Sequence, residues 1–219
     1  HPGMTLIPGI EISCDLPGRE VHVLGYFLDY EDASFQASLA QMRQNRVGRA
    51  KRMLELLAGL GMPLDWERVQ EIAGDASIGR PHVAQALLER GYVRDLREAF
   101  DLYLGNGKPA YVERDKLTPE DAIRQIRAVG GLPVLAHPSF VEDFEALLPD
   151  LIEAGLVGME VYYAAYDAET IQRLLAVANR FGLVPCGGTD YHGRFEGETG
   201  PGEAAVPVET YERLWALRS

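Results

Sequence analysis

Five side chains of this sequence have the types and positions expected of metal ligands. They are Glu11, His22, His137, Asp190 and His192. His137 directly follows the apolar segment 132–136, and the last two follow the apolar segment 183–186 in a glycine-rich turn. Neutral imidazoles and carboxylates are the ligands expected for Zn, Mn or Fe. Glu11 and His22 lie within predicted strands, and the placement of the other three directly after strands predicts one shared metal site.

Each of these residues also has an ordinary structural explanation. A histidine within a strand, such as His22, is more often a hydrogen-bonded core residue than a ligand. An Asp-x-His pair can simply cap a turn. Glu11 lies between Ile10 and Ile12 and should point to the opposite face of its strand, where a carboxylate is rarely buried without a partner. The order of the five residues along the chain is what favours a metal site.

The elements that must position these side chains change character along the chain. Segments 5–7, 10–13 and 21–26 are predicted strands, with a polar turn at 15–19 between the last two. Helical periodicity starts near residue 35, and the run of helices without strands from 48 to 113 is predicted to be a helical insertion. The predicted domains are therefore 1–47, 48–113 and 114–219, the first and last forming one domain.

Four helices are expected in this part of the chain. The first begins before the insertion and continues into it, and the other three lie within it; they cover residues 35–61, 65–72, 81–90 and 95–104. Beyond residue 113, strands at 132–136, 158–163 and 183–186 alternate with helices such as 118–130 and 167–181. This alternation predicts a parallel α/β architecture, open or barrel. In such folds ligands bind at the carboxyl ends of the strands, where the candidate residues lie.

Composition limits the class of protein. Of 219 residues, 47% are hydrophobic and 25% are charged, as in ordinary globular proteins. No apolar run approaches the roughly 20 residues of a membrane span, and Cys14 and Cys186 have no CxxC spacing. Free thiols in a reducing compartment, and hence a cytoplasmic location, are expected. The net charge of −12 argues against extended duplex nucleic acid and favours a small phosphorylated ligand or a strand end.

Four spaced motifs together resemble the PHP (polymerase and histidinol phosphatase) superfamily, and within it the bacterial phosphoesterases that act on nucleotide phosphates. The motifs are PGIEIS at 8–13, VHVLGY at 21–26, AHP at 136–138 and TDYHG at 189–193. Segments 79–84 and 103–112 are also similar to the helical insertion of that branch. The resemblance covers nearly the whole chain and implies a distorted barrel of seven βα units that holds up to three divalent metal ions.

The resemblance also implies a role for each candidate ligand. Glu11 would bridge two metals, His22 and His137 would complete the second metal's ligands, Asp190 would bind the first metal, and His192 the third. Two close cations lower the pKa of a shared water, and the resulting hydroxide attacks phosphorus in line. The metals stabilise the charge that gathers on the phosphoryl oxygens.

The sequence departs from the family pattern at its start. The His-x-His strand and the Thr-Asp-His-Asp type motif of the family are absent, and His1 has no partner two residues away. Two explanations are expected: an N-terminal segment is missing, or the chain is a degraded form of the family. In either case the chain as given has only part of its active site. A smaller departure is the segment 164–166, AAY, where relatives often carry a small polar residue and a His.

The predicted insertion supplies candidate substrate-binding residues, Arg80, His82 and Lys108, although solvated surface charges are an equal alternative for Arg80 and Lys108. The leading hypothesis is a metal-dependent phosphoesterase that acts on nucleotides or oligonucleotide ends. Histidinol-phosphate phosphatase is a second hypothesis within the same class. A non-catalytic binding module with the same fold is a third.

Overall fold

The computed structural model describes residues 5–16, 19–113, 117–193 and 199–218. Contacts between residues divide the chain into two compact units. Unit 1 comprises His1–Phe35 and Lys116–Ser219, and unit 2 comprises Gln36–Asp115. The predicted boundaries are 47/48 and 113/114. One uninterrupted helix, α1 (Ala33–Gly59), contains both residue 47 and the division between Phe35 and Gln36.

Unit 1 begins with an antiparallel hairpin of β1 (Gly9–Leu16) and β2 (Arg19–Tyr26). Residues 5–8, which include the predicted strand 5–7, have no regular secondary structure. Alternation along each strand buries one set of side chains, such as Ile12 and Val23, in the main core. The other set, which includes Glu11 and His22, faces the opposite side of the sheet.

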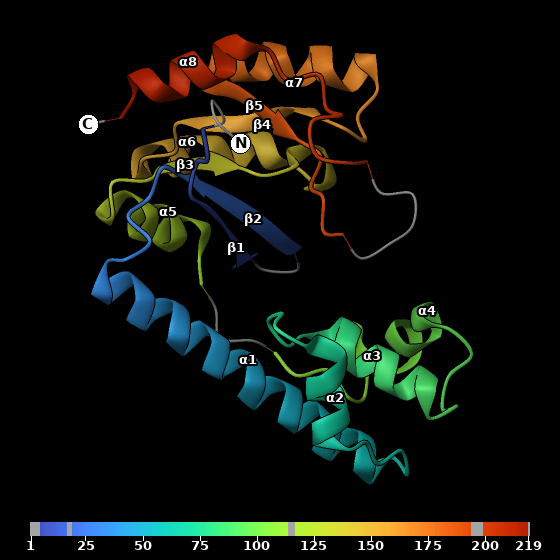
Figure 1. Ribbon diagram of the computed structural model, residues 1–219. Coiled ribbons are helices and arrows are strands. Elements are labelled where there is room, and N and C mark those ends of the chain that lie inside the picture. Colours follow the sequence, from blue (N-terminus) through green and yellow to red (C-terminus); the bar gives the residue numbers. More distant parts are fainter. Residues whose placement is uncertain (1–4, 17–18, 114–116, 194–198, 219) are drawn as a thin grey trace. The chain divides into compact units, whose positions relative to one another are not determined.

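The hairpin is continuous with a mixed sheet in the order β1-β2-β3-β4-β5 among the described residues (Figure 1). The remaining strands are β3 (Leu132–Leu135), β4 (Gly158–Tyr163) and β5 (Val184–Gly188). The β2–β3 pair is antiparallel, whereas β3, β4 and β5 are parallel to one another. The predicted α/β class is confirmed, and its parallel part starts at β3.

The carboxyl ends of the three parallel strands lie at one edge of the sheet. Because β2 runs antiparallel to β3, the start of β2 reaches this same edge. The backbone N–H of Ala136 donates to the carbonyl oxygen of His22 at 3.0 Å. His22 is thereby held beside the end of β3.

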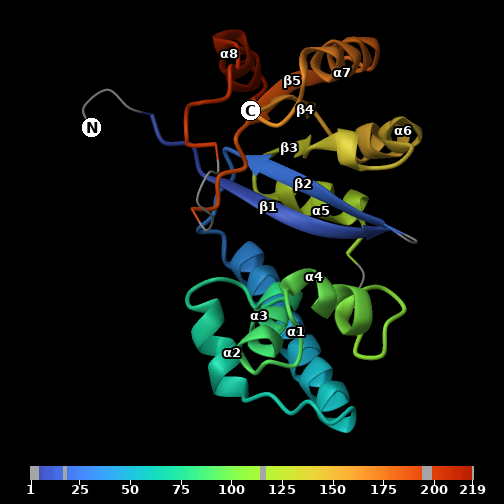
Figure 2. The same cartoon turned by 90° about the vertical axis from the view of Figure 1, so that its right-hand side faces the viewer.

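Helices cover both faces of the sheet in unit 1. The helices α5 (Pro119–Ala128), α6 (Phe144–Ala154) and α7 (Ala168–Arg180) contribute side chains to the main core. On the other face, Leu214 of α8 (Val208–Ala216) packs in a smaller cluster with Leu132 and Val184. The turned view in Figure 2 shows α8 beside β5, apart from α5 and α6.

All regular secondary structure in the described part of unit 2 is helical, and the strand-free run of the prediction is found there. After α1 come α2 (Trp66–Ala73), α3 (Arg80–Glu89), the short α4 (Leu96–Ala99) and a π-helical turn, η1 (Phe100–Leu104). Its own core is built from aliphatic side chains, among them Met53, Leu57, Leu87 and Leu104. The helix predicted at 95–104 is therefore an α-helix only in its first part.

Two further observations concern the whole chain. Among the described residues, no helix combines the length and apolar character needed to cross a membrane. Cys14 and Cys186 form no disulfide within the described part of the chain, and both are buried in unit 1. Burial raises the pKa of the Cys186 thiol to about 12.

Candidate metal centre

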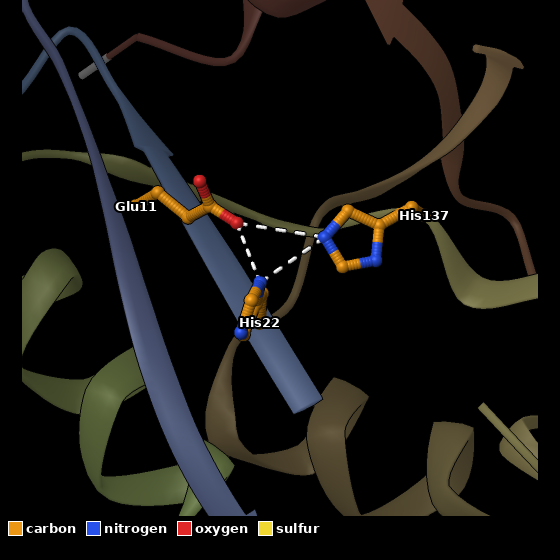
Figure 3. A group of neighbouring side chains, drawn as sticks. All are labelled: Glu11, His22 and His137. Atoms are coloured by element: carbon orange, nitrogen blue, oxygen red, sulfur yellow. Dashed lines mark hydrogen bonds and ion pairs between the residues drawn. The ribbon is translucent and has the colours of Figure 1, made fainter. Parts of the chain in front are cut away.

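Glu11, His22 and His137 converge on one point at the sheet edge (Figure 3). Glu11 Oε1 lies 2.7 Å from Nδ1 of His22 and 3.5 Å from Nε2 of His137. The two imidazole nitrogens are 3.1 Å apart. The three side chains come from β1, from β2 and from the residue two positions after β3, so the sheet itself assembles the group.

The register of the hairpin explains why Glu11 meets His22. Glu11 is paired with Leu24, and Ser13 is paired with His22, so Glu11 and His22 are diagonal neighbours on one face of the sheet. Diagonal neighbours in an antiparallel pair are within reach when their side chains are long. A slip of one residue would send one of the two side chains to the other face.

The backbone of His137 is held in an uncommon conformation. Its φ is 27° and its ψ is 55°, a positive φ that residues other than glycine rarely adopt. The backbone N–H of His137 donates to Oε2 of Glu160 at 2.8 Å. Glu160 lies on β4, is only 5% exposed, and burial raises its pKa. This buried carboxyl group fixes the direction from which His137 enters the site.

Electrostatic interactions within the group favour a carboxylate beside a protonated imidazole. Hydrogen bonds from His137 and His22 outweigh burial and hold the pKa of Glu11 well below its usual range. Burial alone would lower the pKa of His22, but hydrogen bonds to Glu11 and Glu20 raise it to about 9.

The donor set fits a divalent metal ion. Ligand atoms about 2.0–2.2 Å from one metal lie roughly 3–3.5 Å from one another. The separations of 3.1 and 3.5 Å fall in this range, whereas the 2.7 Å between Glu11 Oε1 and His22 Nδ1 is a hydrogen-bond distance that would lengthen around an ion. His22 presents Nδ1 to the group while its Nε2 bonds to Glu20 Oε1 at 2.9 Å. A carboxylate on the second ring nitrogen is the usual support of a metal-bound histidine. His137 differs, since its buried Nδ1 has no hydrogen-bond partner among the described residues.

A second group of possible ligands shares Glu11 with the first. Ligating atoms of Glu11, Asp190 and His192 all lie within 4.8 Å of one another. Asp190, like His137, has a positive φ, here 51°, in the turn after β5. Its Oδ2 accepts a hydrogen bond from the Tyr163 hydroxyl at 3.2 Å. One carboxylate common to two groups is the arrangement that a bridging ligand requires.

The predicted substrate-binding residues all lie in unit 2, and the structure gives two of them local structural contacts. The guanidinium carbon of Arg80 lies 5.9 Å from the centre of the Phe100 ring. His82 accepts a hydrogen bond at Nδ1 from the Gly79 N–H at 3.0 Å, which caps the start of α3. Lys108 is exposed in the turn after η1. His1 lies outside the described residues.

Three residues of the site are not among the predicted ones: Glu20, Glu160 and Tyr163. Glu20 is two residues before His22 on the same strand, and this spacing is a signal that could have identified it. Glu160 offered a weaker signal, a carboxylate between apolar residues of a buried strand. No pattern in the sequence connects Tyr163 to Asp190, since their contact depends on the pairing of β4 with β5.

Known proteins similar to this chain are phosphate-ester hydrolases by name. The 3′,5′-nucleoside bisphosphate phosphatase of Chromobacterium violaceum is 30% identical over 94% of this chain and 75% of its own length. The phosphoribosyl 1,2-cyclic phosphate 1,2-diphosphodiesterase of Eggerthella lenta is 33% identical over 88% of this chain and 75% of its own. A 5′-3′ exoribonuclease of Haemophilus influenzae is 31% identical over 87% of this chain and 70% of its own length. No protein-family model matches the chain.

The fold has a counterpart among solved structures. A protein of Bifidobacterium adolescentis, assigned as a metal-dependent phosphoesterase, superposes with a TM-score of 0.80 and 29% sequence identity. The match covers 98% of this chain and 77% of that protein. Similarity in sequence and similarity in structure therefore extend over almost the same residues.

Proposed function

The chain belongs to the PHP family of metal-dependent phosphoesterases, and from this premise we propose that it hydrolyses phosphate esters of nucleotides or of oligonucleotide ends. The observation that carries the proposal is the convergence of Glu11, His22 and His137 on one point, with donor atoms at separations suited to one cation. The names of two relatives, a nucleoside bisphosphate phosphatase and an exoribonuclease, support the substrate class.

We propose that Mn, Zn or Fe ions, up to three in a complete site, are held by the two groups of ligands. Glu11, His22 and His137 would hold one ion, and Glu11 would bridge it to an ion bound by Asp190. His192 would serve a third. Such ions, when bound, lower the pKa of water and neutralise charge on a phosphoryl group. The sheet of unit 1 would form part of the distorted barrel of the family.

The side chains of the protein itself contribute position and charge. Glu11 remains ionised at neutral pH because its pKa is held low, so it can bind cations without first losing a proton. Glu20 fixes the ring of His22 with Nδ1 toward the group, and Glu160 fixes the backbone of His137. Tyr163 donates to Asp190 and limits the directions in which that carboxylate can point. The site is thus oriented before a cation or a substrate binds.

Metal-dependent hydrolysis tests this proposal directly. The purified full-length protein, freed of metal with EDTA and then given Mn²⁺, should release phosphate from adenosine 3′,5′-bisphosphate. Glu11→Gln should lower kcat/KM by at least about a hundredfold, since each 1.36 kcal/mol is a factor of ten and a shared ligand is lost. It should also lower Mn²⁺ binding measured by calorimetry. Activity without metal, or wild-type activity of Glu11→Gln, would contradict the proposal.

We also propose that Arg80, His82 and Lys108 bind the charged groups of the substrate. A charge-assisted contact in a partly desolvated site is worth about 1.5–3 kcal/mol, so Arg80→Ala and Lys108→Ala should each reduce kcat/KM by roughly ten- to a hundredfold. The metal content should not change. Arg97→Ala provides a control, because the side chain of Arg97 on α4 is 90% exposed. If both variants match this control, Arg80 and Lys108 are surface charges.

A further inference from the structure

An exposed aromatic ring lies directly beside the candidate metal centre. Phe140 ends the one-turn 3₁₀-helix η2 (Pro138–Phe140) that follows His137, and it is 66% exposed. Its ring centre is 6.0 Å from that of His137. Single exposed hydrophobic side chains are common on protein surfaces. Phe140 differs from them in the rigid support beneath it and in its distance from the ligands.

Two tyrosines support the Phe140 ring. Its centre lies 5.9 Å from that of Tyr163, with an interplanar angle of 83°, and 5.7 Å from that of Tyr166, with an angle of 60°. The Tyr166 hydroxyl in turn accepts a hydrogen bond from the backbone N–H of Ser139 at 3.1 Å. Edge-to-face contacts of this kind are favourable and fix the orientation of a ring.

The supporting tyrosines also connect this cluster to the ligands. Tyr163 donates to Asp190, and its ring centre is 6.1 Å from that of His137. Phe140 therefore has a fixed place relative to His137 and Asp190, the candidate ligands of the cations that would bind the phosphate of a substrate.

From this arrangement we propose that Phe140 is a stacking platform for the nucleobase of the substrate, supported by Tyr163 and Tyr166. The inference rests on the proposed function, and it assigns a residue that selects nucleotides over other phosphate esters. Every nucleobase has a π-face, so a stacking platform binds bases with little preference among them. The chemistry fits a substrate with an unpaired base, such as a mononucleotide or the end of a single strand.

A pair of probes that differ only in the base tests the proposal. AMP and ribose 5-phosphate carry the same phosphate and the same sugar. Base stacking is worth enough that Phe140→Ala should raise the Kd for AMP by roughly 5- to 100-fold. The Kd for ribose 5-phosphate should stay within about twofold. Binding would be measured by calorimetry on the Mn²⁺-loaded protein, and kcat/KM for both probes alongside.

Two further variants sharpen the result. Phe140→Tyr keeps an aromatic face and should retain most of the AMP affinity. Tyr30→Ala removes another exposed aromatic ring of unit 1, 55% exposed, and should leave both probes unaffected. Equal losses for AMP and ribose 5-phosphate in Phe140→Ala, or no loss for either, would overturn the stacking role. If the full-length wild-type protein binds and hydrolyses neither probe, the phosphoesterase proposal fails first, and the stacking role fails with it.

Discussion

At the scale of single residues, the two candidate ligands that follow strands are both held at positive φ. His137 has φ 27° and Asp190 has φ 51°. Such conformations cost free energy and persist only where the surroundings impose them, which is frequent at functional sites. For His137 the imposing contact is visible, because its N–H donates to buried Glu160. The ligand is therefore aimed by a neighbouring strand as well as by its own.

Substitution of Glu160 should separate this positioning role from a general effect of packing. Glu160→Ala leaves the His137 N–H without its acceptor, at a cost of about 1–3 kcal/mol, and frees the residue to leave its conformation. We expect weaker Mn²⁺ binding and a lower Tm. Glu160→Gln keeps an oxygen that can accept the same hydrogen bond and should retain most of the affinity. Calorimetric Mn²⁺ titration of both variants gives the comparison, and equal losses in the two would show that charge matters instead of the hydrogen bond.

At the scale of elements, the ends of β4 and β5 carry the residues that surround the site. The pairing between these strands shifts between Glu160 and Tyr162, an irregularity that changes the direction of the following side chains. Gly187 of β5 is paired with Tyr162 at this point. A Cβ atom on Gly187 would lie 2.3 Å from the carbonyl oxygen of Tyr162, closer than any real contact. Only glycine lets the two strands approach here.

We expect Gly187→Ala to destabilise the protein by about 1–3 kcal/mol, as overpacking typically does. The adjacent Gly188 supplies a matched control, since a Cβ there would meet only Glu160 Oε1, at 3.8 Å. Gly188→Ala should therefore unfold at nearly the wild-type urea concentration. Urea unfolding followed by circular dichroism measures both. Similar midpoints for the two alanine variants would be incompatible with a close approach at Gly187 alone.

At the scale of the whole molecule, the metal-free site connects stability to pH. The pKa of His22 is about 9 in the folded protein, against an ordinary value of 6.5 for histidine. Burial lowers this pKa, but the hydrogen bonds to Glu11 and Glu20 outweigh that effect. The folded state therefore holds this proton more tightly than the unfolded state. The resulting stabilisation is complete below about pH 6.5 and is lost as the pH rises through 9. Glu11 adds no slope in this window, because its lowered pKa keeps it ionised throughout.

We therefore expect the free energy of unfolding of the EDTA-treated protein to fall relative to that of His22→Gln between pH 6.5 and 9. The slope of the difference cannot exceed about 1.4 kcal/mol per pH unit for one proton. Comparing the two proteins at each pH removes the contributions of other groups. Metal binding must displace the same proton, so the apparent Mn²⁺ affinity should increase over this range. A difference that does not vary with pH would show that His22 is not protonated in the metal-free fold.

The sequence alone predicted those elements whose ends are marked by local chemistry. Thr118 and Asp167 accept hydrogen bonds from the N–H groups of Asp121 and Thr170, and the helices start within a residue of the predicted positions. The strand predicted at 5–7 was wrong, because a strand also needs a partner and β1 starts only at Gly9. The helix α8 was not predicted, although Tyr211, Leu214 and Trp215 have helical spacing.

The candidate ligands, their order and the class of chemistry could likewise be proposed from the chain, because they depend on residue identity in and beside strands. What only the tertiary structure decided is which atoms meet. Hairpin register brings Glu11 to Nδ1 of His22 and leaves Nε2 for Glu20. The pairing of β3 with β4 and of β4 with β5 places Glu160 under His137 and Tyr163 against Asp190. These contacts join residues far apart in sequence, and no local pattern encodes a distance of that kind.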